Sequence, residues 1–321
     1  MATHESNITR RRFLRQTTSL GVSALIAPAL GQSAFAASKE RVVIYQGVSL
    51  DSLHPYGYSG GGINGIWLHL IEPLIVMDYA REKYVGVLAN AWEFQGRRWI
   101  FHLRNNIRFH NGEPFTSKDV AYSIERMKTD KRSLQGGDIR ELAVETPDDF
   151  TVVFNTKQPL SLLLDRLDTR YIISKAAAEK YGDQADNYAI GTGPYKFVSW
   201  QRGGNLVLAR NDDYWGAKAE IKEVILKGVK EEAARVAGLL SGQADVVSNL
   251  PIEEIDRVAK HPRARVERIP GFRMYFVAMN VAHKPFDNKL VRQAINHAID
   301  PAPMMKHVFS GNGQVLNGPL A

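Results

Sequence analysis

The chain has 321 residues and a formal net charge of +7, with 41 Lys and Arg against 34 Asp and Glu. The basic residues are dispersed among acidic ones and do not form the clustered stripe of a nucleic-acid-binding protein, so we expect no nucleic acid partner. There are no cysteines, which excludes disulfides, thiolate metal sites and cysteine nucleophiles. The length predicts two or more domains.

The first 36 residues have the three regions of a secretory signal peptide. Thr9–Arg15 is basic with consecutive arginines before Phe-Leu, Thr17–Leu30 is weakly apolar, and Ala34–Ala36 is a small-x-small cleavage site. A transmembrane anchor is the alternative, but the apolar run is shorter than the roughly 20 residues that span a bilayer. Consecutive arginines favour the twin-arginine route. We therefore expect Met1–Ala36 to be a cleaved twin-arginine signal peptide, with the twin-arginine translocase as a partner and a periplasmic location.

The first elements after the leader are a strand, a loop and a helix. Arg41–Tyr45 is rich in β-branched residues and predicts a strand, and the glycine-rich segment Ser49–Gly62 predicts a flexible loop. Apolar residues at helical spacing predict a helix over Ile63–Leu74 with one buried face.

From Trp92 onward the apolar residues alternate, which predicts half-buried strands. Trp99, Phe101 and Leu103 share one face, and Ile107 and Phe109 continue the pattern after a turn. The next elements are a helix that opens with a capping box and then a strand: Thr116–Asp119 with Val120, Ile124 and Met127 on the buried face, and Thr151–Asn155.

Helices and strands alternate in the rest of the chain, the α/β pattern of a partly parallel sheet. Asp287 is expected to cap a final amphipathic helix, with Val291, Ile295 and Ala298 inward. Helices are predicted over Leu160–Leu167, Lys175–Tyr181 and Glu231–Ser241, the last stopped by Gly242, and strands over Tyr195–Val198, Leu206–Arg210, Val224–Val229, Asp245–Val247 and Met274–Met279.

Four blocks of sequence occur in order behind the leader, and together they resemble the family 5 extracellular solute-binding proteins, the peptide, nickel and glutathione receptors of ABC importers. Most of their residues also have a structural explanation, such as a tight turn at Gly112, a bend at Gly191 and Gly193, or apolar burial at Tyr214-Trp215. The blocks are Leu88–Trp92 through Trp99–Arg104, Phe109–Gly112, Pro114–Thr116 and Asp119-Val120; Gly191–Tyr195 with Arg210-Asn211 and Tyr214–Gly216; Ser241–Val246; and Ala278–Asn280, Pro285–Asp287 and Val291–Ile295.

The resemblance implies an α/β fold of two lobes, that of the type II periplasmic binding proteins with an extra subdomain in lobe I. It assigns residues 37–65 and 190–265 to the core of lobe I, 66–189 to the inserted subdomain and 266–321 to the start of lobe II. Members of the family continue past Ala321, so the second lobe is expected to be incomplete. The implied function is capture of di- or oligopeptides between the lobes for a membrane permease and its ATPase.

The resemblance also points to three candidate ligand-binding segments. The loop after the first strand reaches the cleft in the family, and some relatives place a ligand arginine near the Leu160 helix. The second lobe begins just before the predicted strand at Met274. The residues implied at these places are Ser49, Leu50 and Asp51; Arg170; and Gly271, Phe272 and Arg273.

Several enzyme and metal motifs are missing from the sequence. Ser59–Gly62 lacks the Lys-Ser/Thr that follows a P-loop, His102 and His110 have no nearby set of carboxylates, and no H-E-x-x-H or S-x-x-K occurs. We expect no catalytic residue, metal or cofactor. A nickel chelate, glutathione, an opine or a saccharide stays open as the ligand, and an exported hydrolase or a signalling receptor stays open as another class.

Overall fold

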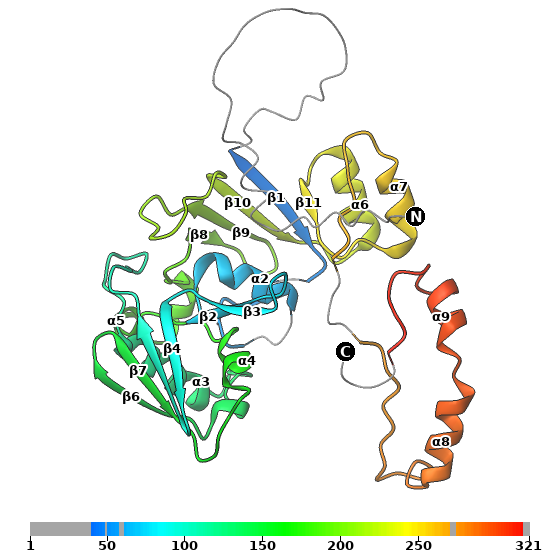
Figure 1. Ribbon diagram of the computed structural model, residues 1–321. Helices are drawn as coiled ribbons and strands as arrows, with labels where there is room; N and C mark the ends of the chain where they lie inside the picture. The colour runs from blue at the N-terminus through cyan, green and yellow to red at the C-terminus, as the bar shows by residue number, and fades with distance from the viewer. Residues whose placement is uncertain (1–39, 49, 58–60, 270–273, 317–321) are drawn as a thin grey trace, which may run out of the picture. The chain divides into compact units, whose positions relative to one another are not determined.

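The computed structural model describes residues 40–48, 50–57, 61–269 and 274–316 (Figure 1). The predicted leader, Met1–Ala36, lies outside the described residues. The chain divides into two compact units: the first contains Leu50–Arg202 and Leu206–Val224, and the second contains Val42–Ser49, Gly203–Asn205 and Ile225–Ala321. Among the described residues, no helix is long and apolar enough to cross a membrane.

A five-stranded sheet is built from β1 (Arg41–Gln46), β8 (Tyr195–Trp200), β9 (Asn205–Arg210), β10 (Glu223–Gly228) and β11 (Val246–Val247). Its strand order is β11-β1-β10-β9-β8. β1 and β11 pair in parallel, with Ile44 opposite Val246, whereas β8 and β9 pair antiparallel. The predicted partly parallel sheet is therefore confirmed.

A four-stranded antiparallel sheet lies within the first unit, in the order β4-β5-β7-β6. Trp99, Phe101 and Leu103 on β5 are buried, as their alternation predicts. Ile107 and Phe109 are buried too, but only Arg108 forms an isolated bridge, so no strand continues there. The strands are β4 (Ala89–Gln95), β5 (Arg98–Leu103), β6 (Ala143–Asp148) and β7 (Thr151–Asn155), and a separate hairpin is formed by β2 (Ile75–Asp78) and β3 (Lys83–Gly86).

Four α-helices of the first unit follow the apolar pattern, with two corrections at their ends. The predicted helix up to Leu74 ends earlier, because Pro73 disfavours helical geometry at the residue before it. The helix predicted from Leu160 starts later, and the Leu160 carbonyl instead accepts the indole N–H of Trp99 at 3.2 Å. The helices are α2 (Gly61–Leu70), α3 (Ser117–Thr129), α4 (Leu163–Leu167) and α5 (Lys175–Tyr181), with 3₁₀ turns η1 (Gly137–Ile139) and η2 (Gly182–Tyr188).

The capping box predicted for α3 is present. The Thr116 N–H donates to Asp119 Oδ2 at 2.9 Å, and the Thr116 hydroxyl donates to the same oxygen at 3.2 Å. Val120, Ile124 and Met127 are fully buried along one face of the helix. The local sequence therefore fixes both the start of α3 and the face that it buries.

Gly191 and Gly193 lie against the last turn of α2. A Cβ at Gly191 would lie 2.2 Å from the carbonyl oxygen of Leu70, and one at Gly193 would lie 2.6 Å from that of His69. The Gly193 N–H donates to the Leu70 carbonyl at 3.0 Å. These glycines are required for close backbone approach as well as for the predicted bend.

In the second unit, α6 (Glu232–Ser241) is followed by Gly242 at φ +81°, the predicted glycine stop. The buried guanidinium of Arg235 donates to the carbonyls of Val229, Lys230 and Asn249. These bonds fix the loops on either side of α6. η3 (Ile252–Glu254) and α7 (Ile255–Ala259) follow.

Three predictions for the C-terminal segment are wrong. Met274–Met279 forms no strand, because no described residue pairs with it. The N-cap of α8 (Lys289–Ala298) is Asn288, not Asp287, since the Asn288 side chain accepts the Leu290 N–H at 2.9 Å. The face of α8 that was predicted to be inward is half-buried at Val291 and Ile295 and exposed at Ala298. A further helix, α9 (Pro301–His307), follows.

Candidate functional site

The loop Leu50–Gly57 carries two of the predicted ligand contacts in the part of the chain that is described. Leu50 is buried, and its carbonyl accepts the indole N–H of Trp200 at 3.2 Å. Asp51 is exposed. The loop therefore presents a carboxylate to solvent from an anchored backbone, whereas Ser49 lies outside the described residues.

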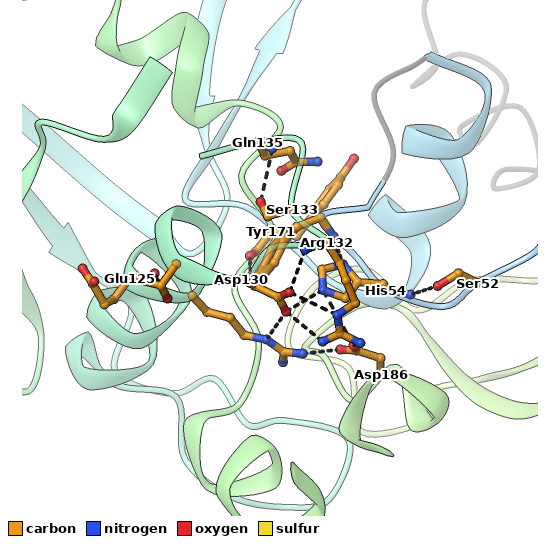
Figure 2. Close-up of polar contacts among 12 residues, drawn as sticks. Ser52, His54, Glu125, Asp130, Arg132, Ser133, Gln135, Tyr171 and Asp186 are labelled. Atoms are coloured by element: carbon orange, nitrogen blue, oxygen red, sulfur yellow. Dashed lines mark hydrogen bonds and ion pairs between the residues drawn. The ribbon is translucent and has the colours of Figure 1, made fainter. Parts of the chain in front are cut away.

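His54, in the middle of this loop, lies at the centre of a polar cluster (Figure 2). It is 3 % exposed, and its Nε2 lies 2.9 Å from Asp130 Oδ2 and 3.8 Å from Asp186 Oδ2. Its Nδ1 accepts the N–H of Tyr56 at 3.2 Å, so the proton of a neutral ring is on Nε2. Both ring nitrogens are therefore engaged.

Two arginines complete the cluster. Arg132 Nη2 lies 2.7 Å from Asp130 Oδ2, and Arg126 Nη2 lies 2.8 Å from Asp186 Oδ1. The hydrogen bonds from Arg132, together with that from His54, hold the pKa of Asp130 well below its usual range. The two carboxylates and two guanidinium groups balance, so the cluster has no net charge when His54 is neutral.

Arg170 is buried, and its guanidinium is already paired. Its Nη2 donates to both oxygens of Asp138, at 2.8 and 2.9 Å, and its Nη1 donates to the Thr169 hydroxyl at 3.1 Å. The next residue, Tyr171, accepts the hydroxyl of Tyr56 at its carbonyl at 2.9 Å. The structure thus joins the Arg170 segment to the 50–57 loop through this bond. A ligand that used Arg170 would compete with Asp138.

The third predicted segment, Gly271, Phe272 and Arg273, lies outside the described residues. The residues that follow it are described. Tyr275 and Phe276 are 72 % and 79 % exposed, and the Tyr275 ring packs against Phe309 with the centroids 5.1 Å apart.

Sequence reasoning missed Glu72, a buried carboxylate of the first unit. It accepts the hydroxyls of Thr192 at 2.8 Å and Tyr214 at 2.7 Å and the indole N–H of Trp215 at 2.9 Å. Burial raises the pKa of Glu72, and the three donors act in the opposite direction. The one local signal is an acidic residue inside an apolar run, and it does not identify partners that lie over a hundred positions away. Tyr214 and Trp215 therefore contribute polar contacts, not only the apolar burial that was expected.

His110 is held in a similar way near the glycines of the second sequence block. Its Nε2 lies 3.0 Å from the Gly193 carbonyl, and its Nδ1 accepts the Gly191 N–H at 3.3 Å. Burial lowers the pKa of His110 to about 4. The ring is thus a neutral structural group. Among the described residues, no group of three or more His, Asp or Glu could hold a metal ion.

Residues 83–321 match the family model of the bacterial extracellular solute-binding proteins, family 5. The chain belongs to this family. The family's fold is mixed α/β, and the predicted fold class is confirmed by solved periplasmic binding proteins. The peptide-bound periplasmic binding protein DppA of Helicobacter pylori aligns with a TM-score of 0.78 at 26 % identity, over 87 % of this chain and 60 % of that one.

Family 5 relatives with different named ligands align with this chain. A glutathione-binding protein of Pectobacterium atrosepticum is 28 % identical over 93 % of this chain. The "Probable D,D-dipeptide-binding periplasmic protein DdpA" of Escherichia coli is 31 % identical over 73 % of it. The solved AgaA protein of Agrobacterium tumefaciens, in complex with agropinic acid, aligns at 27 % identity with a TM-score of 0.76, over 88 % of this chain and 58 % of that one.

The chain spans only part of these family 5 proteins. It covers 59 % of the length of the glutathione-binding relative and 47 % of the dipeptide-binding one. The alignment with the peptide-bound structure likewise includes 60 % of that chain.

Proposed function

We propose that this chain is the extracytoplasmic substrate-binding component of an ABC importer and that it captures short peptides. The observation that carries the proposal is the family 5 match over residues 83–321. Peptide as the ligand class is supported by the peptide-bound structure at a TM-score of 0.78 and by the dipeptide- and glutathione-binding relatives. The partners that follow are a membrane permease and its ATPase.

Location and domain division belong to the same proposal. Met1–Ala36 directs the chain to the twin-arginine translocase and is removed in the periplasm. Residues 37–65 and 190–265 form the core of lobe I, 66–189 its inserted subdomain and 266–321 the start of lobe II. Replacing Arg10 and Arg11 together by Lys should stop export, since the pathway reads the arginine pair. Fractionation of cells that express the tagged chain measures this, and periplasmic recovery of the double variant would contradict the proposed route.

Ligand class is tested by isothermal titration of the purified chain with methionyl-leucine, D-alanyl-D-alanine, glutathione, Ni(L-His) and agropinic acid. We expect one or more of the three peptides to bind. Agropinic acid is the second candidate ligand, because a solved relative with that ligand aligns at 27 % identity. Binding of agropinic acid or Ni(L-His) alone would replace the peptide assignment. Failure of every compound to bind would reject the function for this chain.

The proposed contacts are tested in the same titration. Asp51→Asn removes an exposed charge from the loop and should weaken peptide binding about tenfold if the carboxylate contacts the peptide ammonium group. Asp149→Asn, at an exposed surface pair with Lys118, is the matched control and should bind normally. Equal affinity of the two variants would remove Asp51 from the site.

A further inference from the structure

The 50–57 loop is fixed to the first unit at both of its ends. The Trp200 indole donates to the carbonyl of Leu50, and the Tyr56 hydroxyl donates to that of Tyr171. The carbonyl of Tyr56 accepts the N–H of Leu134 at 2.9 Å. The middle of the loop is held by His54, which lies three positions after Asp51.

Each ring nitrogen of His54 makes a different hydrogen bond. Within the loop, Nδ1 accepts the Tyr56 N–H at 3.2 Å. The backbone N–H of His54 donates to Ser52 Oγ at 3.0 Å, and the two bonds together set the local turn of the loop. Outside the loop, Nε2–H donates to Asp130, the residue that caps the C-terminus of α3. The neutral Nε2–H tautomer is the form that makes both bonds at once. It ties the loop to a regular helix.

A proton added to Nδ1 removes one of these bonds. Nδ1–H then faces the Tyr56 N–H, and two donors have no acceptor between them. The charged groups facing the ring are Asp130 and Arg126 of α3 and its cap, Arg132 after it, and Asp186 of η2. Their formal charges already balance, so the imidazolium adds one net positive charge beside the buried side chains of His54 and Asp186.

We propose that His54, as the neutral Nε2–H tautomer, is a positioning residue that holds the 50–57 loop in its ligand-binding conformation, and that protonation of His54 loosens the loop. The inference rests on the proposed function, because it assigns a role to the loop that carries Leu50 and Asp51. Loosening of the loop on protonation makes peptide affinity fall as the pH falls, without any contact between His54 and the peptide.

The test is titration of the full chain with methionyl-leucine and with glutathione at about pH 7.5 and at about pH 5.5. His54→Asn places an amide oxygen where Nδ1 accepts, and His54→Gln places an amide N–H where Nε2 donates. Each variant keeps one bond and loses the other, so each should bind about fivefold more weakly than the natural chain at pH 7.5, the factor for one hydrogen bond of about 1 kcal/mol. Neither should show the loss of affinity that the natural chain shows at pH 5.5. Lys118→Gln, on the exposed face of α3, is the control and should behave as the natural chain.

The outcomes separate the inference from the function on which it rests. If the natural chain binds neither peptide, the proposed function fails, and the inference fails with it. If the natural chain binds, but both variants match its affinity or keep its pH dependence, the positioning role of His54 is rejected. If neither variant folds, hydrogen exchange at the Tyr56 amide of the natural chain decides. A lower protection factor of the Tyr56 amide at pH 5.5 than at pH 7.5, together with weaker peptide binding, supports the role. An unchanged protection factor or an unchanged affinity overturns it.

Discussion

At the scale of single residues, Glu72 shows how a buried charge is tolerated. Its two oxygens accept three hydrogen bonds from Thr192, Tyr214 and Trp215, and the Arg104 guanidinium lies 5.0 Å from the centroid of the Trp215 ring. Charge-assisted bonds of this kind offset much of the cost of removing a carboxylate from water. The network joins the segment after α2 to the second sequence block, and Arg104 of the first block contacts it through the Trp215 ring.

Glu72→Gln should therefore destabilise the protein by about 1–3 kcal/mol, because the amide nitrogen turns one acceptor into a donor that faces another donor. The free energy of unfolding in urea measures the effect. Glu141→Gln, which alters an exposed pair with Lys157, serves as the control and should cost under about 0.5 kcal/mol. Equal stability of the two variants would mean that the network contributes nothing.

A second prediction at this scale concerns His110 and pH. Its folded pKa of about 4 lies below the ordinary value, so between these values the unfolded chain binds the proton and the folded chain does not. Stability is therefore lost as the pH falls below about 6.5, up to about 3 kcal/mol by the time it reaches about 4. Urea unfolding as a function of pH should show a shallower loss for His110→Asn than for the natural chain. His283→Asn, at an exposed position, should follow the natural curve.

The residue-scale features were the least accessible to sequence reasoning. Alternation identified Phe101 as a core residue because the signal is local, whereas no local signal shows that Thr192 donates to Glu72. Of the predicted ligand contacts that lie within the described residues, Leu50 and Arg170 are buried and bonded, and Asp51 combines a charge with exposure. Burial and prior pairing arise from contacts distant in sequence, so the sequence could not rank these candidates.

At the scale of elements, Gly191 lies against the backbone at the end of α2, where there is no room for a side chain. Gly191→Ala would place a methyl group 2.2 Å from the Leu70 carbonyl oxygen, which neither backbone can accommodate without shifting. We expect a loss of about 2 kcal/mol or more in thermal or urea unfolding. Gly137→Ala is the matched control, since nothing lies within 4 Å of its Cβ position. A Gly191 variant as stable as the Gly137 variant would contradict the close approach.

Elements were predicted well where their signals are short-range and poorly where they depend on a partner. The capping box at Thr116 and the glycine stop at Gly242 both lie at the predicted positions. Met274–Met279 has the residues of a strand, but a strand is stabilised by its neighbours, and none of the described residues pairs with it. The early end of α2 could have been anticipated, because Pro73 is visible in the sequence.

At the scale of the whole molecule, the second unit exposes a run of large apolar side chains. Tyr275, Phe276 and Leu290 are each more than two thirds exposed, and large exposed apolar side chains favour association. The chain of 321 residues should therefore self-associate as its concentration rises, and replacing Tyr275 and Phe276 together by Ser should reduce this. Sedimentation velocity over a concentration series measures it. Leu162→Ser, at an isolated exposed position of the first unit, should leave the profile unchanged.

The position of β1 has a consequence for the order of events in the cell. β1 is the first strand among the described residues, yet it lies between β11 and β10, and the Val43 N–H donates to the Asp245 side chain across 202 positions. A ribosome that adds about 5–20 residues per second needs about 10–40 s to make the intervening chain. Throughout that interval at least one edge of β1 has no partner strand. The proposed twin-arginine route, which carries folded proteins, therefore implies that export begins only after synthesis has passed Val247.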